Sequence, residues 1–229
     1  MISIIGDIHG CFHTLKELVE KIRDKYPSIK IYSVGDLVDR GNFSYEVIEF
    51  IKSQKIEFTP GNHDYMFCYF IRQLPGRMAN AWLQNGCEKT IVSYRKHNNS
   101  VSDHIDLILK APLFINHNDC FISHAGISIN HRQIISKYFP NNLSALENIL
   151  RNDIENIDSI IWARGELLNI GKLQVAGHTR RQNVEYKEFN NVAYIDTSVY
   201  MMNKLSSVIV EDNNILDIVS VATKPEDLE

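Results

Sequence analysis

The first ten residues, MISIIGDIHG, bring a short apolar run to an end in a turn that carries aspartate and histidine. Residues 2–5 are typical of a buried β-strand. Polar side chains gain nothing from the core at the end of such a strand, so Asp7 and His9 either cap the next helix or bind a ligand. The flanking glycines, Gly6 and Gly10, allow a sharp turn that brings both side chains close to a shared ligand.

The same pattern recurs at four further places, always after a β-like run. The blocks are GDLVDRG at 35–41, GNHD at 61–64, SHAG at 123–126 and GHT at 177–179. Because ligand sites in sheets with parallel strands form at the carboxyl ends of the strands, we expect these turns to meet at one edge. A single turn of this kind is most often only a turn, and an isolated histidine is most often a core or surface residue. Five such turns together indicate one shared site.

Strand and helix alternate between the first three blocks. Apolar residues recur at helical spacing in residues 12–25 and again in 45–52, which predicts two amphipathic helices. The first half therefore has the β-α-β-α-β order of a sheet with crossover helices. Residues from 64 to about 110 carry no strand signal, and we interpret them as a mainly helical cap or insertion.

The second half is predicted to contain a further helix at 144–161 and four closely spaced strands. Those strands are LQVA, VAYID, SSVIV and ILDIV, and their spacing favours an antiparallel meander. No repeat, low-complexity tract or linker divides the chain. Residues 1–229 are therefore predicted to form a single domain.

Composition narrows the class of protein. Hydrophobic residues make up 44% of the chain and charged residues 23%, enough for a large core and a polar surface. The net charge is −4 and no basic block stands out, so we expect no nucleic-acid partner. No apolar stretch is long enough to span a membrane, and no basic region precedes the first apolar run. The four cysteines form no CxxC pair, and we predict a cytoplasmic protein with reduced thiols.

The residue types in the five blocks suit a divalent metal. Carboxylates, an amide oxygen and imidazoles without any thiolate form a nitrogen and oxygen ligand set that suits Mn, Fe or Zn. A carboxylate such as Asp36 can bridge two ions about 3.5–4 Å apart, the spacing of two-metal hydrolytic sites. The candidate ligands are Asp7, His9, Asp36, Asn62, His124 and His178.

The blocks GDIHG, GDLVDRG and GNHD, followed by SHAG and GHT, resemble the metal-dependent phosphoprotein phosphatase family of the calcineurin-like phosphoesterase superfamily. WLQNG, WARGE and YIDTSVY make the chain most similar to the small bacterial and phage lambda-type branch, which also contains symmetrical dinucleoside-tetraphosphate hydrolases. The resemblance implies an α/β fold, a four-layer α-β-β-α sandwich of two mixed sheets, with a dinuclear site at their shared edge.

The resemblance also implies a role for each candidate residue. Arg40 and Arg164 would hold the phosphoryl oxygens of the substrate, for which a guanidinium group is suited. His63 would be the general acid that protonates the leaving oxygen, and Asp39 would orient it. One ion would be bound by Asp7, His9 and Asp36, and the other by Asp36, Asn62, His124 and His178.

The activity that this implies is hydrolysis of a phosphomonoester by a hydroxide bound to two divalent ions, with Mn expected first and Fe or Zn as alternatives. Serine/threonine phosphoprotein is the leading substrate class. The alternative is symmetrical hydrolysis of a dinucleoside tetraphosphate at the same site. A third hypothesis, a phosphoprotein-binding module without catalysis, is disfavoured because every ligand and acid-catalysis position is filled.

The chain departs from the family pattern at the expected rim of the cleft. Ser198, Met201 and Met202 stand where small relatives often have glycine, which puts the choice of substrate in doubt but not the metal site. Arg180 and Arg181 follow GHT directly. They either add positive charge to the same rim or are simply solvated.

Overall fold

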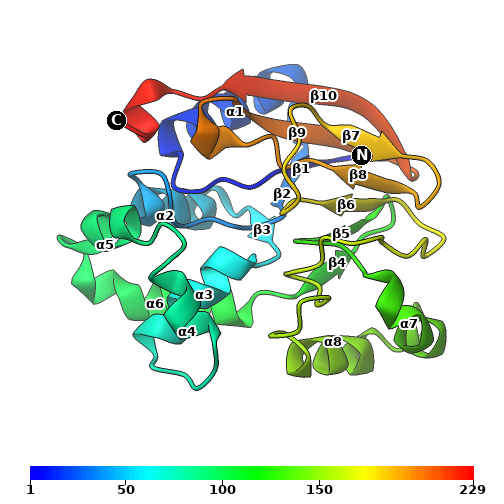
Figure 1. The fold of residues 1–229 in the computed structure, drawn as a ribbon. Helices are drawn as coiled ribbons and strands as arrows, with labels where there is room; N and C mark the ends of the chain where they lie inside the picture. The colour runs from blue at the N-terminus through cyan, green and yellow to red at the C-terminus, as the bar shows by residue number, and fades with distance from the viewer.

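Two five-stranded mixed sheets form the centre of the computed structural model, which describes residues 1–229 (Figure 1). The strand orders are β10-β9-β1-β2-β3 and β4-β5-β6-β8-β7. The first sheet contains β1 (Ile2–Ile5), β2 (Lys30–Ser33), β3 (Glu57–Phe58), β9 (Lys204–Glu211) and β10 (Asn214–Ala222). The second contains β4 (Phe114–Asn116), β5 (Phe121–Ser123), β6 (Gln174–Ala176), β7 (Glu185–Lys187) and β8 (Val192–Tyr194).

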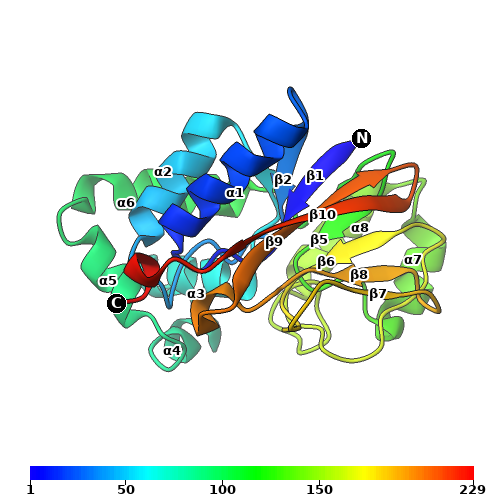
Figure 2. The same ribbon diagram turned by 90° about the horizontal axis from the view of Figure 1, so that it is seen from above.

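Helices cover the outer faces of both sheets, as the view from above shows (Figure 2). The helices α1 (Phe12–Lys25) and α2 (Ser44–Gln54) lie outside the first sheet, and α7 (Arg132–Tyr138) and α8 (Leu143–Asn152) lie outside the second. Between the sheets, Ile4 and Val208 from the first pack with Ile122 and Val175 from the second in one buried cluster. The predicted four-layer sandwich is therefore confirmed.

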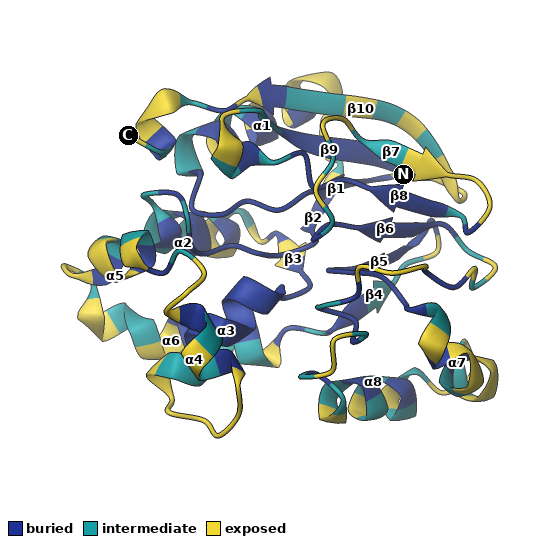
Figure 3. Cartoon of the chain, in the orientation of Figure 1, coloured by how far each residue is buried: buried dark blue, intermediate teal, exposed yellow.

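The first sheet follows from the strand and helix pattern of the first half. β1 pairs in parallel with β2, and β2 with β3, so α1 and α2 are crossover helices. Leu15, Leu18, Val19 and Ile22 of α1 are all buried in the main core. In Figure 3 the central strands are coloured as buried, whereas much of the helical surface is exposed. This parallel arrangement directs the turns after β1, β2 and β3 to one edge.

The predicted antiparallel meander of the second half is wrong. β6 and β8 are parallel neighbours in the second sheet, and the unpredicted strand β7 connects them in sequence. The chain then crosses to the first sheet, where β9 pairs antiparallel with β1 and forms a hairpin with β10. Alternating apolar residues mark a strand but do not tell which of two sheets it joins.

The predicted helix at 144–161 is shorter than expected, because α8 ends at Asn152. The following residues form turns held by local side-chain hydrogen bonds. Asn156 Nδ2 donates to Asp153 Oδ1 at 3.2 Å, and Ser159 Oγ donates to the Ile154 carbonyl at 3.0 Å. Such side chains compete with the helical backbone, although Ile154 itself still packs into the core.

Residues 62–110 are mainly helical. They form α3 (Asn62–Ile71), α4 (Met78–Trp82), α5 (Glu88–Tyr94) and α6 (Val101–Lys110), with a short 3-10 turn before α6. Phe67, Trp82 and Ile105 bury their side chains in the same core as α1 and α2. The assignments as a cap or insertion and as part of a single domain stay predictions. No helix of the structure combines the length and apolarity needed to cross a membrane.

Candidate metal centre

The turns after β1, β2, β3 and β6 meet around a polar cavity of about 290 Å³. Of the predicted residues, Asp39 and His124 do not line the cavity and are fully buried just behind it. The lining consists of Asp7, His9, Asp36, Arg40, Asn62, His63, Arg164, His178, Arg180, Asp196 and Tyr200. The expectation that the glycine-flanked turns converge is therefore met.

The backbone of these turns is strained. His9 and Asp36 both have φ of 46°, and His178 has φ of 59°, in the left-handed region that residues with a Cβ rarely adopt. Asp39 and Arg40 follow with φ of 71° and 74°. Unfavourable conformations of this kind cluster where a structure must aim particular side chains at a functional site.

Two glycines let the backbone approach the buried carboxylates. A Cβ at Gly61 would lie 2.0 Å from Asp36 Oδ1, and a Cβ at Gly177 would lie 1.9 Å from Asp7 Oδ1. Neither distance is tolerated by a real Cβ. These positions in the GNHD and GHT blocks therefore require glycine for close approach, whatever their backbone conformation.

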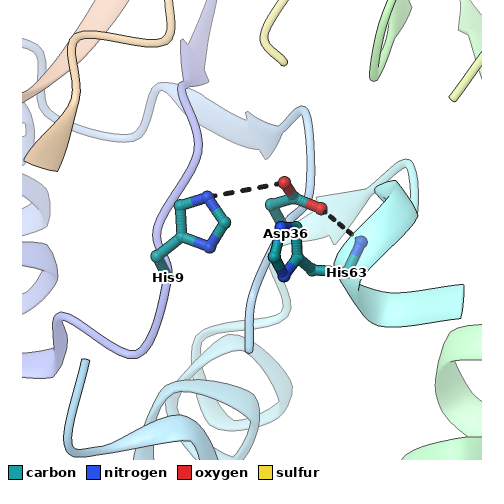
Figure 4. A group of neighbouring side chains, drawn as sticks. All are labelled: His9, Asp36 and His63. Atoms are coloured by element: carbon teal, nitrogen blue, oxygen red, sulfur yellow. Dashed lines mark hydrogen bonds and ion pairs between the residues drawn. The ribbon is translucent and has the colours of Figure 1, made fainter. Parts of the chain in front are cut away.

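Two groups of side chains could each hold a metal ion, and Asp36 belongs to both. One group is His9, Asp36 and His63, the other is Asp36, His124 and His178, and in each the ligand atoms lie within 4.8 Å of one another. In Figure 4, Asp36 lies between His9 and His63: its Oδ2 is 3.5 Å from His9 Nε2, and its Oδ1 accepts from the His63 backbone N–H at 2.9 Å.

Carbonyl groups orient the imidazoles for metal binding. His9 Nδ1 donates to the Val38 carbonyl at 3.1 Å, and His124 Nδ1 donates to the Val34 carbonyl at 2.8 Å. The other ring nitrogen, Nε2, lies 3.5 Å from Asp36 Oδ2 in His9 and 3.6 Å from it in His124, within reach of an ion shared with that carboxylate. Burial lowers the pKa of both imidazoles, which favours the neutral form that binds metals.

His178 has the opposite orientation. Its Nε2 donates to the Trp162 carbonyl at 3.2 Å, which leaves Nδ1 as the free ligand atom. Burial also lowers the pKa of this imidazole. In each of the three rings one nitrogen donates to a backbone carbonyl, and each histidine belongs to a group that contains Asp36.

Asp7 lies beside these groups but outside both of them. Its two carboxylate oxygens accept from the His178 backbone N–H at 3.2 and 3.0 Å. Burial, together with the nearby Asp196 and Asp36, raises the pKa of the Asp7 carboxyl well above its usual range. A divalent cation would supply the positive charge that keeps such a buried carboxylate ionised, so the residues present fit the implied ions.

His63 and Asp39 form the pair that the acid–base prediction requires. His63 Nδ1 donates to Asp39 Oδ2 at 2.7 Å, which directs Nε2 toward the cavity. Asp39 also accepts from Trp82 Nε1 at 3.0 Å and from Thr90 Oγ1 at 2.7 Å. Burial raises the pKa of Asp39, and these donors oppose the rise. Trp82 of α4 and Thr90 of α5 therefore connect the helical segment to the site.

The two predicted phosphate-binding arginines differ in their surroundings. Arg40 is half-buried, and its guanidinium donates to Nε2 of His9 and of His63, both at 2.9 Å. The same group lies 4.0 Å from the ring centroid of Tyr200, a cation–π contact. Arg164 is exposed and donates to the His178 carbonyl at 3.2 Å.

Sequence reasoning missed two residues of the cavity. Asp196 and Tyr200 both come from the block YIDTSVY, which begins at the last residue of β8. The rule that found the other turns, a polar residue just after a buried strand, would have found Asp196. Tyr200 carried no such signal, because an aromatic residue at that spacing equally suits the core.

Comparison with known proteins identifies the family. The model of the family described as calcineurin-like phosphoesterase matches residues 1–197. The chain belongs to this family. It is a metallophosphoesterase, a hydrolase whose two buried histidine and aspartate groups are consistent with a dinuclear metal site. The family resemblance and the enzyme class predicted from the sequence are therefore confirmed.

Similar curated proteins are tetraphosphatases. The chain is 32% identical over 145 residues to "Bis(5'-nucleosyl)-tetraphosphatase PrpE [asymmetrical]" of Anoxybacillus flavithermus, covering 55% of this metallophosphoesterase and 57% of the relative. It is 32% identical over 127 residues to "Bis(5'-nucleosyl)-tetraphosphatase, symmetrical" of Buchnera aphidicola, covering 54% and 42% of the two chains. The matched chain thus spans about half the length of these curated relatives.

Similar solved structures cover nearly the whole chain. A putative diadenosine tetraphosphatase aligns with a TM-score of 0.63 and 23% identity over 98% of this chain and 94% of the other. A cold-active protein-tyrosine phosphatase of a Shewanella species aligns with a TM-score of 0.67 and 18% identity over 97% and 80%. At these identities the structures show that the metallophosphoesterase fold is shared.

Proposed function

We propose that this metallophosphoesterase hydrolyses a phosphoanhydride bond of a dinucleoside tetraphosphate. The observation that carries the proposal is a groove of about 550 Å³ next to the metal cavity, because Arg164 and Arg180 line both. Neither arginine forms an ion pair with a carboxylate: Arg164 donates to the His178 carbonyl and Arg180 to the Met201 thioether. A substrate with several linked phosphates can occupy the cavity and the groove together, whereas a phosphomonoester needs the cavity alone.

The tetraphosphatases among the curated relatives also support this substrate class. They support the alternative of the sequence analysis better than its leading interpretation, a serine/threonine phosphoprotein phosphatase. The latter remains the second candidate because a yeast serine/threonine phosphatase shares the fold at 17% identity. The similar tetraphosphatases include symmetrical and asymmetrical enzymes, so the assay has to determine which bond is cleaved.

The proposed mechanism assigns each side chain of the site a task. Arg40 and Arg164 bind the attacked phosphoryl group, whose oxygens gain charge in the transition state. Arg40, which donates to His63 Nε2 in this structure, would turn to the phosphoryl oxygens when substrate binds. His63, protonated on both ring nitrogens, would then deliver the Nε2 proton to the leaving oxygen while Asp39 holds Nδ1. When bound, two divalent ions, with Mn proposed first and Fe or Zn as alternatives, supply an activated water and neutralise phosphoryl charge. The proposed ligands are Asp7, His9, Asp36, Asn62, His124 and His178.

The four cysteines are buried and unpaired. Free thiols suit the reducing cytoplasm, which we propose as the compartment.

The test compares substrates in parallel on the Mn-loaded protein. We expect kcat/KM for diadenosine tetraphosphate to exceed that for phosphoserine and phosphotyrosine peptides. Chromatography of the products then distinguishes symmetrical cleavage, which yields ADP alone, from asymmetrical cleavage, which yields ATP and AMP. A phosphoserine peptide hydrolysed with the higher kcat/KM would overturn the proposal in favour of the second candidate.

A further inference from the structure

The groove beside the metal cavity is bordered by an unusual turn. Ser198 and Met202 both have φ of 59°, and they flank a short 3-10 turn at Val199–Met201. Residues with a Cβ are disfavoured in this conformation, which explains why glycine suits these positions. The chain keeps a strained backbone where glycine would relieve it.

Val199 anchors this turn in the main core, but the two methionines do not stabilise the fold by burial. Met201 is 58% exposed and Met202 is 52% exposed, although both are large and apolar. Between them and the strained Ser198, Tyr200 packs against Arg40 inside the cavity. Backbone strain together with exposed apolar side chains at the rim of a substrate cavity points to binding.

Arg180 contacts Met201 at the wall of the groove. Its Nη1 lies 3.0 Å from Met201 Sδ, and the guanidinium has no carboxylate partner. Its neighbour Arg181 also lines the groove, but its guanidinium pairs with Glu185 and lies 4.7 Å from the ring centroid of Tyr194. Of two adjacent arginines, only Arg180 is therefore free to bind an anion.

We infer that Arg180 and Met201 form a subsite for the part of the substrate beyond the attacked phosphorus. The Arg180 guanidinium binds the phosphate that follows the attacked one in the polyphosphate, because this side chain lines both the cavity and the groove. The Met201 thioether packs against the attached nucleobase, since sulfur makes favourable contacts with aromatic rings and the flexible side chain adapts to them. This inference rests on the proposed function and adds residues that select a dinucleotide over a phosphomonoester.

The closing experiment measures kcat/KM of Arg180→Ala on diadenosine tetraphosphate and on p-nitrophenyl phosphate, which has no second phosphate. We expect a loss of about 10- to 100-fold on the dinucleotide, the size of one lost charge-assisted hydrogen bond, expressed mainly in KM. The loss on the monoester should be at least tenfold smaller. Arg181→Ala is the matched control. It removes the same positive charge from the adjacent residue and should not change the ratio of kcat/KM between the two substrates.

A second pair of variants tests the turn. Met201→Ala should raise KM for the dinucleotide more than for the monoester. Met202→Gly should raise the melting temperature, because glycine adopts a left-handed φ without strain. A lower melting temperature for Met202→Gly would show that packing holds the turn and would overturn the argument from strain.

The outcomes separate this inference from the proposed function. If the unmodified protein does not hydrolyse diadenosine tetraphosphate, the proposed function fails and the subsite fails with it. If it does, but Arg180→Ala and Arg181→Ala shift the substrate ratio equally or not at all, the subsite alone is refuted.

Discussion

Gly61→Ala should displace the carboxylate that belongs to both metal groups. The new Cβ would lie 2.0 Å from Asp36 Oδ1 and 2.7 Å from the Asp36 backbone nitrogen. Since real Cβ contacts are essentially never below 3.0 Å, the carboxylate has to move by about 1 Å. Its hydrogen bond from the His63 backbone N–H, now 2.9 Å, would break with the same shift.

A displacement of this size is large for a metal ligand, because ligand distances vary by only about 0.2 Å in well-formed sites. We expect Gly61→Ala to bind fewer than two ions and to lose about 10²-fold in kcat, the usual consequence of a 1 Å misplacement. Plasma mass spectrometry gives the metal content, and kinetics with diadenosine tetraphosphate and p-nitrophenyl phosphate gives the rate.

Gly165→Ala is the matched control, because a Cβ there meets nothing within 4 Å. It should retain both ions and the activity of the unmodified protein. If Gly61→Ala also keeps two ions and an unchanged kcat, Asp36 does not bridge the ions and the proposed ligand assignment is wrong.

Three further predictions concern acid catalysis, stability and pH. His63→Asn should lower kcat about 10²–10⁴-fold on phosphoserine but far less on p-nitrophenyl phosphate, because the leaving group of the latter needs no proton. Asp39→Asn should show the same selectivity more weakly. Equal losses on both substrates would exclude His63 as the acid. Asp227→Ala should lower the free energy of unfolding by about 2 kcal/mol in urea titrations, because the buried carboxylate accepts three hydrogen bonds at the start of α1; a change within error would contradict that capping role. Burial lowers the pKa of His104 from its usual 6.5, so acidification protonates the unfolded chain first and destabilises the fold. His104→Gln should therefore lose less unfolding free energy between about pH 7 and pH 5 than the unmodified protein, and parallel curves would refute this.

The metal cavity was largely predictable because its residues are local to strand ends. Asp7, Asp36 and Asn62 each follow a short apolar strand, and the parallel pairing of those strands brings the turns together. Short-range patterns are enough for this part of the fold. The same reasoning applies to His124 after β5 and His178 after β6.

Contacts between distant parts of the chain were not predictable in the same way. Trp82 and Thr90 reach Asp39 only because α4 and α5 pack beside the turn after β2. The apolar residues around Trp82 and Thr90 have the pattern of ordinary helix faces, so no local sequence signal indicates their contact with Asp39. The position of the β9–β10 hairpin also depends on a distant part of the chain. It joins the first sheet because β9 pairs with the edge of β1 that β2 leaves open.

The strained turn at Ser198 and Met202 shows a third limit. The sequence reveals that glycine is missing from these positions, but only the structure shows that both have a left-handed backbone. The same holds for His9 and Asp36, whose positive φ angles follow from the convergence of the turns and oppose their intrinsic preference.

Anomalous scattering from crystals grown with Mn²⁺ and measured on both sides of the manganese absorption edge tests the central claim, a two-metal phosphoesterase centre. The account predicts two peaks in the cavity about 3.5–4 Å apart, with the Asp36 carboxylate between them. One peak lies near His9 and the other near His124 and His178. A single peak, or peaks away from Asp36, would contradict the account.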